Sequence, residues 1–185
     1  MAFFEDETVP PEISTLTLPE WVQPGAHRVG VSLPQTAVVF NDGKTACVVR
    51  KFVAHPTGLE FSIEIRHCRE FKQERFRDVW SGGGFRYGVL LADGTQVLLN
   101  RVNSWPPSRP EGASYTLVQT DGGGSDSIFR IGLWLTPLPP DGELTVVVEW
   151  KPEGFDETRT TIDLGALRET ATHSIELFPD DRVFD

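Results

Sequence analysis

Residues 45–54 read TACVVRKFVA and residues 59–66 read LEFSIEIR, and these two runs decide the fold. Both are rich in β-branched and aromatic residues, and the turn-forming sequence HPTG separates them. Apolar and polar residues alternate in the second run, as in a strand with one buried and one solvent-facing side. The two runs therefore predict a β-hairpin. Its buried face carries Phe61, Ile63 and Ile65, and its polar face, with Glu60, Ser62, Glu64 and Arg66, meets water.

Similar short apolar runs recur along the chain, each bounded by turn residues such as Asp93-Gly94. Further strands are predicted at residues 28–33, 37–41, 85–92, 96–102, 115–119, 127–136, 143–150 and 158–162. A short helix is predicted after Asp163, which can cap it, because Leu164, Leu167 and Ala171 recur at helical spacing. The series predicts a mainly β fold, namely a two-layer antiparallel β-sandwich or distorted barrel with one short C-terminal helix.

The alternation also predicts the core. We expect one apolar cluster between the two layers, made of Phe61, Ile63, Ile65, Phe129, Ile131, Leu133, Val146, Val148 and Trp150. Trp134 falls on the opposite face of its strand, beside Arg130. It is therefore either covered by a terminal segment or partly exposed.

The net negative charge is concentrated at the two ends of the chain. The net charge is −10, and residues 1–24 contain five acidic side chains and no Lys or Arg. We interpret residues 1–24 as an extended acidic N-terminal arm and residues 25–185 as a single β-sandwich domain. Residues 66–84 are either a short helix or a loop, and their composition favours a loop. The charge predicts no general affinity for nucleic acid or for an anionic membrane.

The sequence favours a cytoplasmic protein. The N-terminus lacks a basic and apolar leader, and no apolar run approaches the ~18 residues of a membrane span.

If Ala54 pairs with Leu59, the two cysteines become diagonal neighbours, with Cys47 opposite Arg66 and Cys68 opposite Thr45. This placement suits a disulfide poorly, so two free thiols are favoured over a redox-linked pair.

No motif in the sequence predicts catalysis, a metal or a cofactor. The glycine runs at residues 82–84 and 122–124 lack the lysine and the following helix of a phosphate-binding loop, so both are interpreted as connectors. No Gly-x-Ser-x-Gly elbow is present. The four histidines, His27, His55, His67 and His173, lack the spacing of metal ligands.

Two tryptophans in expected loops are the candidates for a binding surface, because large exposed rings often mark a contact. These are Trp80 and Trp105, and the polar Arg101 and Asn103 lie just before the second of them. The basic and aromatic residues between 66 and 80 could also suit nucleic acid, but their acidic neighbours and the net charge of the chain argue against it.

From Gly83 onward the chain carries an ordered series of motifs that resembles a family of uncharacterised actinobacterial proteins. The series is Phe85-x-Tyr87-Gly88-Val89, Ala92-Asp93-Gly94, the glycines at Gly122, Leu133-Trp134-Leu135, Pro137-Leu138-Pro139-Pro140, Gly142, Leu144, Glu149-Trp150, Glu157-Thr158-Arg159, the helix and Leu177-Phe178-Pro179. The glycine run is shorter than in the family, and Phe178 stands where a Trp is expected. The resemblance implies a bacterial intracellular protein and assigns it neither an activity nor a catalytic residue.

Two functional hypotheses remain from the sequence. The first is a non-enzymatic β-sandwich that binds a protein partner, a small ligand or a second copy of itself. The alternative is an enzyme, hydrolase-like, whose site is assembled from distant strands. A pocket holding titratable residues with shifted pKa values would favour the enzyme.

Overall fold

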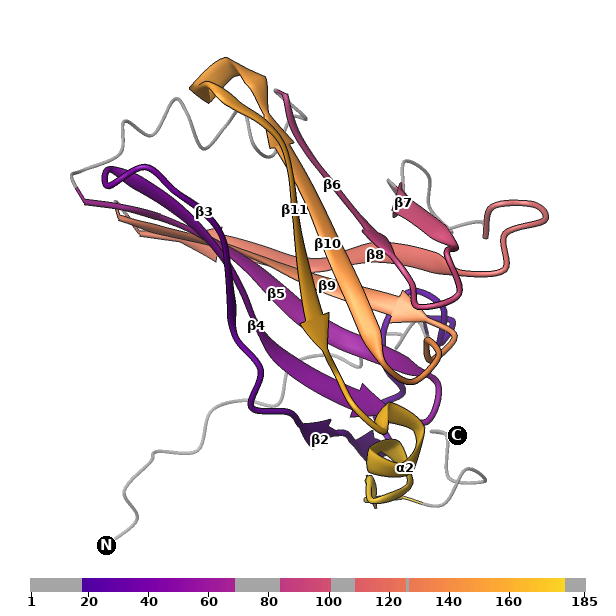
Figure 1. The fold of residues 1–185 in the computed structure, drawn as a ribbon. Helices are drawn as coiled ribbons and strands as arrows, with labels where there is room; N and C mark the ends of the chain where they lie inside the picture. The colour runs from indigo at the N-terminus through magenta and orange to yellow at the C-terminus, as the bar shows by residue number, and fades with distance from the viewer. Residues whose placement is uncertain (1–17, 69–83, 101–108, 126, 179–185) are drawn as a thin grey trace, which may run out of the picture.

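The computed structural model describes residues 18–68, 84–100, 109–125 and 127–178 (Figure 1). The strands are β1 (Arg28–Val29), β2 (Val31–Ser32), β3 (Ala37–Asn41), β4 (Thr45–His55), β5 (Gly58–His67), β6 (Phe85–Leu90), β7 (Gln96–Asn100), β8 (Thr116–Gly124), β9 (Ile128–Thr136), β10 (Glu143–Trp150), β11 (Phe155–Asp163) and β12 (Ile175–Glu176). The helical segments are the 3-10 turn η1 (Lys151–Glu153) and the helix α2 (Leu167–Thr172). The predicted mainly β fold is confirmed.

One ten-stranded sheet curls into two facing layers (Figure 1). Its strand order is β11-β10-β6-β7-β8-β9-β5-β4-β2, and β3 continues the edge next to β4. The first layer contains β3, β4, β5, β9 and β8, and the second contains β6, β10 and β11. A separate two-stranded sheet joins β1 to β12. This arrangement is a sandwich that is continuous along one side, in the manner of a half-barrel.

The sheet is mixed rather than purely antiparallel. β7 and β8 are parallel, with Leu99 opposite Leu117. Residues 101–115 separate these strands, and a connection of that length can return the chain to the same end of the sheet, as a parallel pair requires. The other pairings of the described strands are antiparallel.

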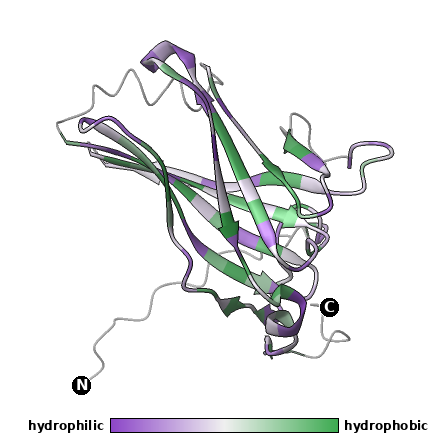
Figure 2. Ribbon diagram, in the orientation of Figure 1, coloured by the Kyte–Doolittle hydropathy of each residue, from purple (hydrophilic) through white to green (hydrophobic). Residues whose placement is uncertain are grey.

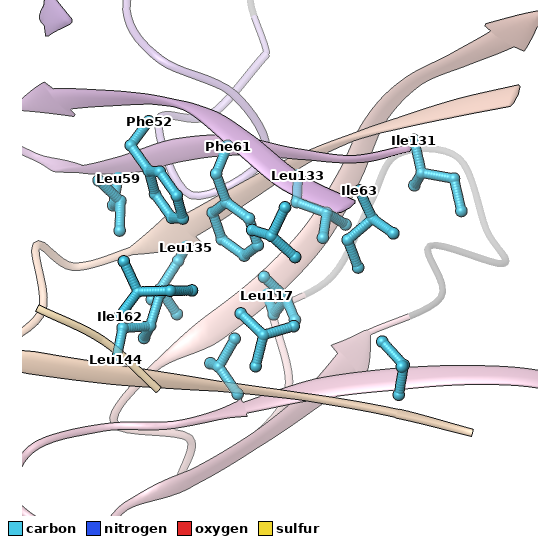
Figure 3. Packing of buried hydrophobic residues seen from close by; sticks show 14 of the residues in the cluster. Phe52, Leu59, Phe61, Ile63, Leu117, Ile131, Leu133, Leu135, Leu144 and Ile162 are labelled. Atoms are coloured by element: carbon cyan, nitrogen blue, oxygen red, sulfur yellow. The ribbon is translucent and has the colours of Figure 1, made fainter. Parts of the chain in front are cut away.

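The core fills the space between the two layers. Hydrophobic residues recur along the strands of both layers in Figure 2, and Figure 3 shows buried side chains meeting across the gap. The predicted cluster is confirmed, because all nine of its members are buried in one hydrophobic core: Phe61, Ile63, Ile65, Phe129, Ile131, Leu133, Val146, Val148 and Trp150. Leu164, Leu167 and Ala171 of the helical region join it.

The two layers also meet on the side where the sheet is open. Phe40 of β3 stacks on Phe155 of β11, with ring centroids 3.8 Å apart. Gln35 Nε2 donates a hydrogen bond to the carbonyl oxygen of Asp163 (3.1 Å). Within the described residues, no backbone hydrogen bond joins β3 to β11. Side chains therefore close this seam.

A β-bulge in β4 changes which residues face the core. Arg50 pairs with Ser62 and Val53 with Glu60, so Lys51 and Phe52 together oppose Phe61. Lys51 has a φ of 59°, a left-handed backbone conformation that is uncommon for a residue other than glycine. Because of the extra residue, the inward positions shift from Cys47 and Val49 before the bulge to Phe52 and Ala54 after it.

The bulge corrects the predicted cysteine geometry. Ala54 pairs with Leu59 as expected, but one inserted residue places Cys47 opposite Ile65 instead of Arg66, and Thr45 opposite His67 instead of Cys68. Cys47 is buried in the core, which raises the pKa of its thiol to about 12, whereas Cys68 is exposed. Both thiols are free.

The glycines at 122–124 form a strand instead of the predicted connector. Gly122, Gly123 and Gly124 pair with Ile131, Arg130 and Phe129 of β9. The strongly strand-forming β9 supplies the partner, so the glycines need no side chains to pack. Gly124 lies so close to β9 that a Cβ there would overlap the carbonyl oxygen of Ile128. The prediction of a connector is therefore wrong for this segment.

Hydrogen bonds between residues far apart in the sequence determine two further features. Trp134 is fully buried, and its Nε1 donates to the carbonyl oxygen of Glu20 (2.8 Å). An N-terminal segment therefore covers Trp134, which was one of the two predicted alternatives.

The first turn of α2 is held by Asp141, whose Oδ1 accepts from the Arg168 amide (2.7 Å), and not by Asp163. Among the described residues, no helix has the length and apolar character needed to cross a membrane.

The backbone conformation at Lys51 gives a stability test. Lys51→Gly should keep or raise the free energy of unfolding, because glycine adopts a positive φ without a steric penalty. Lys51→Val should lower it by about 1–2 kcal/mol, since a β-branched residue is strongly disfavoured in this conformation. Urea unfolding of both variants measures the difference. Equal stability of the two variants would contradict the conformation described for β4.

Candidate functional site

Glu64 of β5 is completely buried, although the sequence predicted that it faces water. It lies on the outer side of the first layer, and Ser62 beside it is also buried. The prediction failed because the strand pattern alone does not show what covers the outer face. Here, the long side chains of neighbouring strands lie over the carboxylate and remove it from solvent.

Three arginines surround the Glu64 carboxylate. Arg66, on the same strand, donates to Oε2 from Nε (3.2 Å) and Nη2 (2.6 Å). Arg130, directly opposite on β9, donates to Oε1 from Nε (3.0 Å). Arg50 of β4 approaches Oε2 with Nη1 at 3.9 Å. Strand register therefore brings together cations that are far apart in the sequence.

These contacts determine the protonation state of Glu64. Burial by itself would raise the pKa of the carboxyl group, but the hydrogen bonds from Arg66 and Arg130 and the positive charges of both side chains outweigh it. The pKa of Glu64 consequently lies below its ordinary value of 4.5. Glu64 is ionised at neutral pH and can act as a fixed anchor for the guanidinium groups.

The cluster carries more positive than negative charge. The single carboxylate of Glu64 faces three guanidinium groups. Arg66 donates both hydrogen bonds that Oε2 accepts, and Arg50 contacts this oxygen only at ionic distance. Nη1 and Nη2 of Arg130 make no hydrogen bond with the described part of the chain. The side chains of Arg50 and Arg130 are about two-fifths exposed, at 40% and 42%. Both can therefore reach a ligand.

A groove of about 470 Å³ adjoins these arginines, and we call it the arginine groove. The segment between β2 and β3 forms one wall, and the bulge of β4 forms another. The lining residues are Ser32, Leu33, Pro34, Gln35, Thr36, Arg50, Lys51, Phe52, Val53, Glu60, Ser62, Asp121 and Arg130. The bulge contributes directly, because it places Arg50 and Lys51 consecutively outside the core between the buried Val49 and Phe52.

Several polar groups that line the groove lack a partner within the described residues. Nε of Arg50 and Oε1 of Gln35 are buried atoms without a hydrogen bond. The exposed Asp121 carboxylate and Lys51 ammonium group also line the groove and have neither a hydrogen bond nor an ion pair there, so a ligand can contact them. Buried polar atoms normally form hydrogen bonds, so buried polar atoms without a partner in a groove indicate where a ligand or ordered water binds.

A second cavity, of about 410 Å³, lies against His55. The His55 side chain is only 8% exposed, and its Nε2 is 3.5 Å from Oε2 of Glu60, too long for a good hydrogen bond. The lining residues Glu20, Gly25, His27, Arg28, His55, Pro56 and Thr57 include neither serine nor cysteine. The described part of this cavity therefore offers an imidazole beside a carboxylate, with the hydroxyl-bearing Thr57 also in its lining.

The sequence-predicted binding residues Trp80, Arg101, Asn103 and Trp105 all lie outside the described residues. The structure brings together a different set, centred on Glu64, Arg50 and Arg130, which sequence reasoning missed. The other histidines are separate from this cluster: His67 contacts Thr45 through Nδ1 (2.8 Å), and His173 is exposed. No three acidic, histidine or cysteine side chains in the described ranges are placed to hold a metal ion.

Comparison with family models, curated proteins and solved structures gave no match to this chain. The resemblance to the actinobacterial family therefore stays a prediction. The candidate site has to be interpreted from its own chemistry.

The buried carboxylate gives a prediction for stability. Glu64→Gln should lower the free energy of unfolding by about 2–4 kcal/mol at pH 7, because three guanidinium groups lose their counter-charge. The matched control is Glu157→Gln on β11. Glu157 receives the same two hydrogen bonds from an arginine two residues away, Arg159, but the Glu157 side chain is 54% exposed. Its loss should cost no more than about 1 kcal/mol.

The same variant has a defined pH dependence. Since the pKa of Glu64 is lower in the folded than in the unfolded chain, its contribution is complete above 4.5 and is lost as the pH falls through the folded value. The stability difference between wild type and Glu64→Gln should therefore narrow below pH 4.5, as measured by urea unfolding. A difference that is independent of pH would contradict the ionised anchor.

Proposed function

We propose that this protein binds a small anionic ligand, through a carboxylate or phosphate group, in the arginine groove. In this proposal it is a non-enzymatic cytoplasmic binding protein. The free thiols of Cys47 and Cys68 suit a reducing compartment. The cavity beside His55 supports an enzymatic function less strongly than the charged side chains of the arginine groove support ligand binding.

The observation that carries the proposal is the buried Glu64 beneath three guanidinium groups. A buried carboxylate is costly unless it is paired, so its presence indicates that the arginines are held in a fixed arrangement. Guanidinium groups bind carboxylates and phosphates in a planar, two-pronged geometry. Arg50 and Arg130, each with nitrogens that Glu64 does not use, are therefore prepared to receive an external oxyanion.

The charge distribution favours a small ligand over a polymeric one. The whole chain has a net charge of −10, which repels nucleic acids and other polyanions at long range. The cationic side chains Arg50, Lys51 and Arg130 are confined to one groove, where a compact anion can contact them at short range. Binding of this kind should weaken as the salt concentration rises, because part of the site is solvent-exposed.

Calorimetric titration with inorganic phosphate and with acetate at low ionic strength tests the proposal. Arg50→Gln should weaken binding of whichever anion associates by about tenfold, as expected for the loss of one charge-assisted contact. Arg50 makes only the 3.9 Å ionic contact with Glu64, so this variant leaves the hydrogen bonds of Glu64 in place. Arg130→Gln should weaken binding at least as much.

Arg159→Gln is the control, because Arg159 is equally basic and lies on the other layer. It should bind the anions as wild type does. The proposal is wrong if neither anion binds, or if all three arginine variants bind equally well while remaining folded by circular dichroism.

A further inference from the structure

The arginine groove contains acceptors as well as cations. The Asp121 carboxylate lines it, and the buried Oε1 of Gln35 has no hydrogen-bond donor among the described residues. Glu60 is the other acid of the groove, and it is within 3.5 Å of His55. A simple anion would satisfy Arg50 and Arg130 but would leave the buried Oε1 of Gln35 without a donor and the exposed Asp121 carboxylate without a counter-charge.

Asp121 is held in place by two features of the sheet. A bulge at Thr120 shifts the register of β8, so that Asp121 pairs with Gly132 of β9. The Asp121 carboxylate then occupies the space that a side chain at position 132 would fill, because a Cβ built there would overlap it. The sequence thus combines a bulge and a glycine to position one negative charge on the outer face of β9.

The negative and positive centres lie on the same face of β9. Gly132, beneath Asp121, and Arg130 are two residues apart along the strand, a rise of about 7 Å. Asp121 and Arg130 form no ion pair with each other, although both are fully described. Opposite charges that line one groove without neutralising each other are complementary to a ligand that carries both signs.

We infer that the ligand is a small zwitterion, with a carboxylate at Arg50 and Arg130 and an ammonium group at Asp121. This inference rests on the proposed anion binding and adds the second charge. The separation along β9 favours an amine and a carboxylate joined by several methylene groups over an α-amino acid. Gln35 Oε1 is an additional acceptor for an N–H of the ligand.

A homologous series of ligands tests this arrangement. Wild-type protein is titrated calorimetrically with glycine, β-alanine, γ-aminobutyrate and ε-aminocaproate, and with acetate, propionate, butyrate and caproate as the matched anions that lack the amine. We expect the longer amino acids to bind roughly fivefold more tightly than the matched anions, as for one partly exposed ion pair. Glycine should show little or no such advantage.

Two variants locate the amine. Asp121→Asn should abolish the advantage of the amino acids and leave the affinity for butyrate and caproate unchanged or higher. Gly132→Ala should do the same by displacing the Asp121 carboxylate. Asp156→Asn, an exposed acid on the other layer, is the control and should retain the advantage.

The outcomes separate the two proposals. Equal binding of amino acids and matched anions, or an advantage that survives Asp121→Asn, overturns the zwitterion inference while anion binding at the arginines stands. Failure of every anion and amino acid to bind overturns both.

Discussion

The extra residue in β4 is the constraint on which both the core and the groove depend. Without it, a strand of this length would place Lys51 toward the core and Phe52 toward water, because side chains alternate strictly. With it, Val49 and Phe52 are both buried, and the two residues between them both lie outside. One insertion thus completes the apolar packing against Phe61 and gives the outer face two adjacent cations.

The outer face of the first layer shows how a polar cluster can be as well defined as a core. Arginine side chains take the place of water around the Glu64 carboxylate, and each of its oxygens accepts a charge-assisted hydrogen bond. The arginines in turn extend their aliphatic stems over the sheet. Because the carboxylate cannot move without exposing unpaired charges, the positions of Arg50 and Arg130 follow from the register of β4, β5 and β9.

Periodicity in the sequence predicted most of the strands, the core residues and the short helix, because burial follows directly from alternation, but it did not predict β12 or the separation of β1 from β2. The sequence pattern also contains the bulge. Cys47 and Val49 can share a face with Phe52 and Ala54 only if one extra residue is inserted between Val49 and Phe52. Glu64 carried no such signal. Its burial depends on Arg130, which is 66 positions away in the sequence, and only the pairing of β5 with β9 shows that they meet. The glycines of β8 were misassigned for the same reason, because their structure comes from the strand beside them.

The seam between β3 and β11 has a consequence for self-association. Each of these strands ends the sheet, and an unpaired strand edge is a template for another chain. Here the two edges face each other and are kept together by the stacked rings of Phe40 and Phe155 and by the Gln35 hydrogen bond. If the seam opened, both edges would become available on the same molecule. A molecule with two different exposed edges adds partners head to tail, and such an assembly grows into a filament unless the rotation between copies closes it into a ring.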